Sequence, residues 1–196
     1  MAWGKNGTPD TLGSAGDVMT ISDMSANKFN TIMTHQFMSG ADTGRRRTFN
    51  SNSNSVYARR YNANGGTDGT GVSQTYWELG LGDGDDFSIC YLCSISGEEK
   101  LGIMFVINQV TAGAGTAPQR LEFVGKFVPS PDADITRIDC NNTAAGSFNT
   151  SSNISALGSD MTPAAGQTAT ISDGAIFYET DNNKSYVLYN GSWTEV

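Results

Sequence analysis

The stretch that decides the fold covers residues 86–128 and reads DFSICYLCSISGEEKLGIMFVIN, then a glycine-rich break, then QRLEFVGKFV. In its first segment, alternate residues fall on opposite faces of an extended chain. One face carries Phe87, Ile89, Tyr91, Cys93 and Ile95, and the other carries Ser88, Cys90, Leu92, Ser94 and Ser96. This period of two predicts a half-buried β-strand.

Two further strand-like runs follow, Lys100–Asn108 and residues 119–128. The first of them is apolar on both faces, with Leu101, Ile103, Phe105 and Ile107 on one and Met104 and Val106 on the other. We therefore expect this strand to be covered on both sides. The second places Leu121, Phe123, Gly125 and Phe127 opposite the charged Arg120, Glu122 and Lys126. Together the three runs predict consecutive antiparallel strands in the middle of a sheet.

The length, composition and charge of the chain limit the fold classes and partners that it can have. Its 196 residues are enough for one sizeable domain, or for a domain with a small appendage. Charged residues make up 16% of the chain, and Asn, Ser, Thr and Gly fill many polar positions, which suits an all-β fold with many turns. The formal net charge of -8 disfavours nucleic acid as a partner. We expect an antiparallel β-sandwich that is jelly-roll-like.

The three cysteines are Cys90, Cys93 and Cys140. Cys90 and Cys93 have the spacing of half a zinc or redox motif, but residues three apart in a strand point to opposite faces. They are therefore poorly placed to share a metal or a disulfide. We expect the cysteines to be small apolar residues of the interior, and we expect neither a metal nor a cofactor.

Residues 1–16 form a polar, glycine-rich arm with one aromatic residue, Trp3. Such a tryptophan either anchors the arm to a neighbouring subunit or folds back on its own domain, and both alternatives stay open. For the arm as a whole, we expect a neighbouring subunit to order it. The chain shows no signal peptide and no run of transmembrane length, so we expect synthesis in the cytoplasm and no membrane partner.

One covering helix is expected over residues 23–37. Its apolar residues recur at helical spacing and are Met24, Phe29, Ile32, Met33 and Phe37. Asp23 can cap the start of this helix, and Gly40 follows its end. An amphipathic helix of this length would cover one face or one end of the sheet.

A basic cluster in this acidic chain is formed by Arg45, Arg46 and Arg47. Three adjacent arginines either bind an anionic partner, pair with an acidic loop of a neighbouring subunit, or are solvated loop charge. We retain them as candidate interface residues together with Trp3 and Trp193.

A second charged cluster, Asp83, Asp85 and Asp86, superficially resembles a calcium loop. The glutamate that closes an EF-hand loop is missing, and the predicted flanking elements are strands and not helices. Asp-Gly is also a common signal for a hairpin turn. The sequence leaves calcium binding open here, and we predict no metal site.

The C-terminal end looks like a separate small unit. A linker near residues 161–166 divides the sandwich, residues 17–160, from a β-meander at residues 167–196. Asn190 and Gly191 form a strong type I′ turn signal between two of its strands. A meander of this size is not stable alone and must dock on its own domain or on a neighbour.

Two segments carry a resemblance to known proteins. GAIFYETD at residues 174–181, with KSYVLYNGSW at residues 184–193, resembles a β-hairpin unit that recurs in tail-fibre and other virion proteins of tailed phages. The segments GEEKL at residues 97–101 and AGTAPQRLEFVGK at residues 114–126 look like virion proteins of viruses of marine bacteria and archaea. The resemblance implies a structural virion protein of a tailed phage or archaeal virus.

The first functional hypothesis is therefore a structural component of a virus particle. It would be a surface-exposed capsid-decoration, tail-fibre or knob subunit, made in the host cytoplasm and acting through oligomeric assembly. The expected partners are copies of the chain itself and other virion proteins. By analogy with fibre and decoration proteins, we prefer a trimer, and a hexameric or larger ring is the alternative.

Two other classes of function are weighed against it. In a carbohydrate- or receptor-binding module, aromatic side chains could stack on a host-surface glycan, and the candidates are Tyr57, Tyr61, Tyr76 and Trp77. In an enzyme, a carboxylate pair such as Glu78 and Asp86 could act, but no nucleophile–histidine–acid set is visible. We expect a protein that is not an enzyme and name no catalytic residue.

Overall fold

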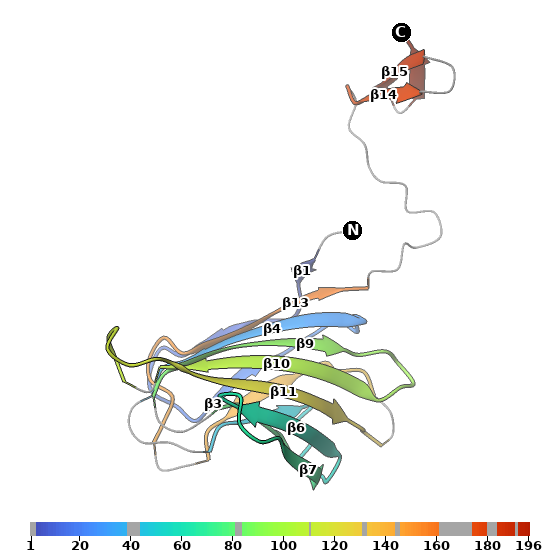
Figure 1. Ribbon diagram of the computed structural model, residues 1–196. Coiled ribbons are helices and arrows are strands. Elements are labelled where there is room, and N and C mark those ends of the chain that lie inside the picture. Colours follow the sequence, from blue (N-terminus) through green and yellow to red (C-terminus); the bar gives the residue numbers. More distant parts are fainter. Residues whose placement is uncertain are drawn as a thin grey trace. The chain divides into compact units, whose positions relative to one another are not determined.

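Figure 1 shows the computed structural model, which describes residues 3–38, 44–80, 84–109, 111–130, 133–143, 146–160, 174–179, 184–190 and 192–196. These residues form strands, turns and loops, and there is no helix among them. The chain divides into two compact units, Met1–Met161 and Thr162–Val196. The first unit is an antiparallel β-sandwich, as the sequence predicts.

The larger sheet of the sandwich has nine strands, eight of them in the order β1-β13-β4-β9-β10-β11-β6-β7, while β2 also pairs with β13. These strands are β1 (Gly4–Lys5), β2 (Asp10–Thr11), β4 (Phe29–Gln36), β6 (Tyr57–Ala63), β7 (Gly69–Gln74), β9 (Asp86–Cys93), β10 (Lys100–Asn108), β11 (Gln119–Phe127) and β13 (Asn153–Ser159). The three consecutive strands predicted from the sequence, β9, β10 and β11, lie side by side in the middle of this sheet (Figure 1).

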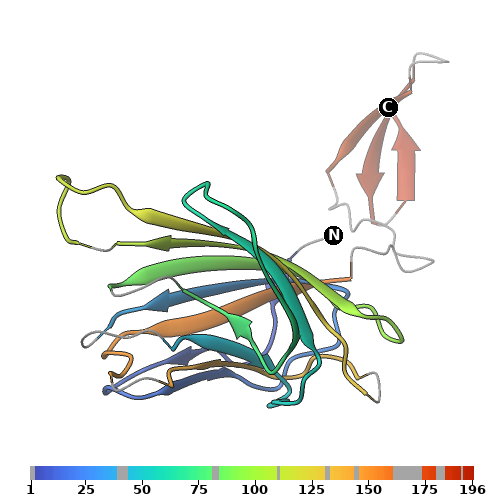
Figure 2. The same ribbon diagram turned by 60° about the horizontal axis from the view of Figure 1, so that its bottom comes forward.

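The smaller sheet lies against one face of the larger one, which we call the inner face, and the turned view of Figure 2 shows it as a second layer. Its order is β3-β12-β5-β8, with β3 (Val18–Ile21), β12 (Ile138–Asn141), β5 (Arg46–Phe49) and β8 (Trp77–Glu78). Aromatic contacts join the two layers. The ring of Phe49 lies 5.3 Å from that of Phe127, and the ring of Trp77 lies 5.4 Å from that of Phe123.

Trp77 is fully buried because two glycines of the larger sheet leave room for its indole. Gly102 of β10 and Gly125 of β11 are direct partners in the strand register. A Cβ atom at either position would lie 2.7 Å from an atom of the indole. The indole Nε1 donates a hydrogen bond to the carbonyl of Lys126 at 3.2 Å. Trp77 thereby ties β8 to the middle of the larger sheet.

The helix expected over residues 23–37 is wrong, because this segment contains the eight-residue strand β4. Its burial alternates strictly, with Ile32 and Thr34 fully buried and Met33 between them partly exposed. The β-branched residues of the segment fit a pleated strand better than a helix. β4 also pairs along its length with β9 on one side and β13 on the other, so tertiary pairing overrides the helical spacing.

The N-terminal arm belongs to the larger sheet of its own chain. β1 and β2 both pair with β13, and the backbone of Gly16 pairs with Phe148. The buried side chain of Asn6 fixes the arm further, because its Oδ1 accepts from the Ser25 amide at 2.8 Å. The expectation that a neighbouring subunit orders the arm is therefore wrong for the described residues.

The second unit is a three-stranded antiparallel meander, as expected for the C-terminal end. Its strands are β14 (Ile176–Glu179), β15 (Lys184–Tyr189) and β16 (Ser192–Glu195). Asn190 has a positive φ of 50°, which a type I′ turn requires at this position. Leu188 is 7% exposed and is the register partner of Trp193, which is 43% exposed.

Candidate functional site

The most unusual surface of the first unit is the outer face of the larger sheet, opposite the smaller sheet. Seven large apolar side chains on β9, β10 and β11 are 40–54% exposed there: Phe87, Tyr91, Leu101, Ile103, Phe105, Ile107 and Val124. We call these residues the outer patch. The expectation that β10 is covered on both sides is wrong within the first unit, where its inner face alone is buried.

Polar side chains border the outer patch on two sides. Towards β6, three exposed ion pairs lie along the border, namely Arg60–Asp68, Arg120–Glu122 and Lys126–Glu99. Towards β13, polar and apolar residues alternate on the same face as the patch, because the register places His35 opposite Asn153, Met33 opposite Ser155 and Thr31 opposite the apolar Leu157. An apolar centre with a polar rim is the anatomy of a protein interface.

A groove of about 780 Å³ lies on this face at the Leu101 end of β10. Its lining reaches from Trp3, beside the β1 edge of the sheet, to Val72 of β7 near the other edge. Between them the lining includes Tyr91, Leu101 and Val124, and also the paired glycines Gly102 and Gly125. The glycines that admit Trp77 on the inner face thus also border the groove on the outer face.

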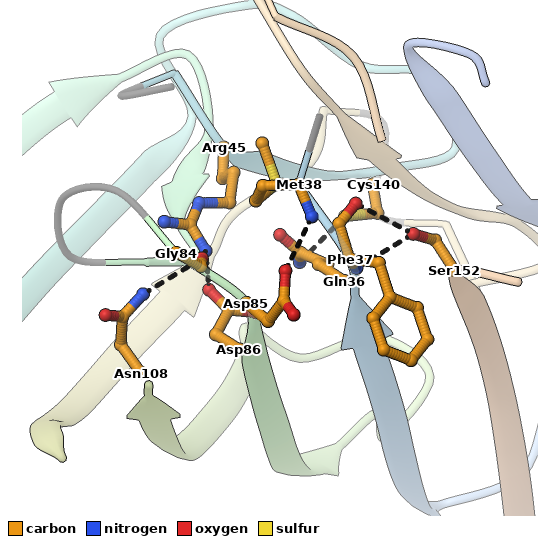
Figure 3. Close-up of polar contacts among 10 residues, drawn as sticks. All are labelled: Gln36, Phe37, Met38, Arg45, Gly84, Asp85, Asp86, Asn108, Cys140 and Ser152. Atoms are coloured by element: carbon orange, nitrogen blue, oxygen red, sulfur yellow. Dashed lines mark hydrogen bonds and ion pairs between the residues drawn. The ribbon is translucent and has the colours of Figure 1, made fainter. Parts of the chain in front are cut away.

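A cluster of polar side chains is buried between the two sheets at the Asn108 end of β10 (Figure 3). Arg45 donates to the carboxylate of Asp86, and both side chains are almost completely buried. The carbonyl of Gly84 accepts from Arg45 Nη1 at 3.4 Å and from Asn108 Nδ2 at 3.2 Å. These bonds hold the segments before β5 and β9 against the end of β10.

The same cluster continues towards β12 (Figure 3). Gln36 Nε2 donates to the sulfur of Cys140 at 3.3 Å, and the Ser152 hydroxyl accepts from the Phe37 amide at 2.9 Å. Burial raises the pKa of the Cys140 thiol to about 12, so this thiol is neutral at physiological pH. A cluster so completely enclosed is out of reach of a substrate, and we assign it a structural role.

Arg47 is the third charged member of this interior. Its guanidinium is fully buried, donates to Thr34 Oγ1 at 2.9 Å and lies 3.5 Å from the sulfur of Met104. Among the described residues no carboxylate forms an ion pair with it, and its Nε has no hydrogen-bond partner. Burial raises the pKa of the nearby Cys90 thiol, and the charge of Arg47 offsets part of that shift.

The arginine cluster expected at an interface is therefore split by the structure. Arg45 and Arg47 face the interior because residues two apart in a strand share a face. Arg46 points the other way, and its guanidinium carbon lies 4.2 Å from the centre of the Tyr76 ring. The expectation that Arg45 and Arg47 contact a partner is wrong, since neither is accessible.

The two tryptophans expected at an interface, Trp3 and Trp193, lie in different units of the chain. Trp3 is 42% exposed and lines the groove on the outer face, so it remains a candidate contact. Trp193 lies in the second unit and is also partly exposed.

The aspartates of the possible calcium loop have other partners. Asp86 is held by Arg45, and Asp85 Oδ1 accepts from the Met38 amide at 2.8 Å (Figure 3). Asp83 lies outside the described residues. Within the described part of the chain, no group of three or more His, Cys, Asp or Glu side chains could hold a metal.

The expectation that the cysteines lie in the interior is confirmed for Cys90 and Cys140 and is wrong for Cys93, which is only partly buried. Cys90 faces the interior, Cys93 lies on the outer face, and both are free, as is Cys140. The predicted glycan-stacking residues are less favourable, since Tyr57 and Trp77 are buried in the core. Tyr61 and Tyr76 are partly exposed, but guanidinium groups lie over both rings.

The sequence pattern identified the apolar residues of the outer patch on β9 and β10 and wrongly predicted that those on β10 are covered, and it did not identify Val124. The available signal was the presence of apolar residues on both faces of β10, although this pattern does not say which face stays exposed. Among the described residues there is no helix long and apolar enough to cross a membrane. Comparisons with protein-family models, curated proteins and solved structures found no match to this chain.

Proposed function

We propose that the protein is a structural subunit of a virus particle, a surface-exposed capsid-decoration, tail-fibre or knob subunit that acts through oligomeric assembly. The observation that carries the assembly role is the outer patch. Half-exposed apolar side chains on three adjacent strands are costly in water, and they favour burial against another protein. The assignment to a virus particle is supported by the resemblance of the C-terminal and middle segments to virion proteins.

The architecture suits such a role. The first unit consists of two layers, each of them a sheet of hydrogen-bonded strands, around a shared core that is rich in aromatic residues. Its partners would be further copies of the chain and other virion proteins. A small second unit with exposed Tyr178 and Tyr189 provides a separate surface for contacts.

Assembly is tested by static light scattering of the purified full chain over a range of concentrations. We expect a mass that is a multiple of 20.8 kDa. Membership of a particle is tested by mass spectrometry of purified particles, together with antibody labelling of their surface. A chain that stays monomeric and is missing from the particles would overturn the proposal.

A carbohydrate- or receptor-binding function is the second candidate, and the groove favours it. Trp3 and Tyr91 line this groove and are partly exposed, which allows their rings to stack on a sugar. Binding of the full chain to a glycan array, and its loss in Tyr91→Ala, would support this function. An array without signal, beside a stable oligomer, would favour the structural role alone.

A further inference from the structure

We propose that a second copy of this chain covers the outer patch, and that two copies pack outer face to outer face about a two-fold axis near the middle of β10. This inference rests on the proposed function, because it specifies the contact through which the subunit assembles.

The size of the outer patch suits an interface. An aromatic side chain buries on the order of 200 Å² when it is fully enclosed, and an aliphatic one roughly 120 Å². Three aromatic and four aliphatic side chains at 40–54% exposure therefore present roughly 500 Å² of apolar surface, and the exposed Trp3 and Val72 of the adjoining groove add to it. A standard interface buries about 800 Å² on each partner, polar rim included, and the largest apolar patch on a typical monomer, about 300–600 Å², is often functional.

The apolar counterpart of the patch within the first unit is the patch itself. Away from the outer face and its borders, Val18 on β3 is the one large apolar side chain that is exposed among the described residues of this unit. A head-to-tail contact would need a second, different apolar surface. The first unit therefore favours a symmetric pair over the trimer expected by analogy with fibre proteins.

The two halves of the patch complement each other. The groove lies at the Leu101 end of β10, while Phe87 and Ile107 are register partners at the other end and do not line the groove. An axis between Ile103 and Phe105 would place Phe87 and Ile107 of each copy over the groove of the other. In such a contact the same two regions meet twice, as a two-fold axis requires.

Charge permits this approach of two acidic chains. Each copy carries a net charge of -8, which opposes contact through most of the surface. Along the β6 side of the patch, however, Arg60, Arg120 and Lys126 are each paired with a carboxylate of the same chain. The border is therefore locally neutral, and the centre of the patch carries no charge.

The first test is chemical cross-linking with a short bismaleimide. In a full chain with Cys93→Ser, the remaining natural thiols, Cys90 and Cys140, are fully buried. In this background we expect Phe105→Cys, next to the axis, to give a covalent dimer at twice the chain mass. Val18→Cys, on the other sheet, is the matched control and should stay a single chain on a denaturing gel.

The second test measures dissociation by analytical ultracentrifugation. Ile103→Lys would place one charge of each copy in a desolvated contact, near the same charge of the other copy. We expect the dissociation constant to rise at least about 100-fold. Val18→Lys adds the same charge elsewhere and should leave the constant unchanged. Circular dichroism checks that both variants keep the β-fold.

The outcomes separate this inference from the proposed function. A stable oligomer with no cross-link at Phe105→Cys and no effect of Ile103→Lys would overturn the two-fold contact. The contact between subunits would then have to involve another surface, such as the second unit, and the proposed role as an assembling subunit would still stand. A chain that is monomeric at every concentration and is not found in particles would overturn both.

Discussion

At the scale of single residues, the glycine pair under Trp77 is the most demanding feature of the core. Gly102→Ala would place a Cβ atom 2.7 Å from the indole, which is fully buried. We expect the free energy of unfolding to fall by about 2–3 kcal/mol, which is typical of an overpacked core. Urea denaturation measures this change.

The control for this prediction is Gly115→Ala in the loop between β10 and β11, where a Cβ atom would meet nothing within 4 Å. It should change stability by less than about 0.5 kcal/mol. Adding Trp77→Phe to Gly102→Ala should restore part of the loss. If Gly102→Ala is as stable as the parent, the indole of Trp77 does not occupy the space beside Gly102.

The buried arginines allow a second prediction, because one is paired with a carboxylate and the other is not. Arg45→Met would leave Asp86 buried without its cation, and we expect a loss of about 3–5 kcal/mol. Arg47→Met removes a buried charge that has no carboxylate partner among the described residues. Its stability should stay within about 1 kcal/mol of the parent or rise above it. Equal losses in the two variants would contradict this distinction.

The Cys140 thiol predicts a dependence of stability on alkaline pH. Burial raises its pKa from 9.0 to about 12 in the folded protein, so above pH 9 the unfolded chain releases the proton first. The stabilising contribution is complete below pH 9 and is lost between pH 9 and about 12. From pH 8 to pH 10, the parent should lose about 1.4 kcal/mol more than Cys140→Ser. Parallel pH profiles of the two proteins would contradict the burial of this thiol.

At the scale of elements, the sequence predicted strands well where one face is apolar and tight turns mark both ends. β9, β10, β11 and the C-terminal meander were all recognised from period-two patterns and from turns such as that at Asn190. β5 was missed, because three consecutive arginines look like surface charge. The burial of Arg45 and Arg47 depends on their partners Asp86 and Thr34, and Asp86 comes from a distant part of the chain.

β4 was mistaken for a helix because its apolar residues fit both periods. The orientation of the β10 faces was misjudged for a related reason, since Met104 and Val106 are apolar but so are Ile103 and Phe105. Local pattern does not say which of two apolar faces the rest of the chain will cover. The sequence therefore identifies residues of the candidate site, but it does not predict that they form an exposed surface.

The strand assignment of β4 is testable by thiol labelling in a Cys93→Ser background. Met33→Cys should react readily with maleimide, and Ile32→Cys should react much more slowly, because adjacent strand residues face opposite sides. Thr31→Cys should follow the first and Thr34→Cys the second. In the predicted helix, Ile32 and Met33 would share a face, so equal rates at these positions would contradict the strand.

At the scale of the whole molecule, the chain combines a sandwich that leaves one apolar face open with a small unit of few buried residues. Each unit taken by itself exposes apolar side chains. The polar cluster and the aromatic core hold the two sheets together without using the outer patch. Mutations in the outer patch should therefore weaken the contact between two copies of the chain without loss of the fold. Assembly and folding can then be measured separately.

The two units should likewise unfold separately. In the second unit, Leu188 is the one large apolar side chain that is nearly buried among the described residues, and its register partner is Trp193. Removing either side chain takes away much of the unit's small core, and Leu188→Ala should cost about 2–3 kcal/mol. A three-stranded unit has little stability to lose, so we expect it to unfold.

Limited proteolysis followed by mass spectrometry tests this separation. Leu188→Ala and Trp193→Ala should be trimmed to fragments that end between the two units, near residue 161, while the sandwich stays intact. Tyr189→Ala is the matched control, because this neighbouring side chain is 73% exposed and contributes little to the core. If both core variants resist the protease as the parent does, the second unit gains its stability from contacts beyond its own strands. If instead the sandwich is degraded together with it, the two units fold as one.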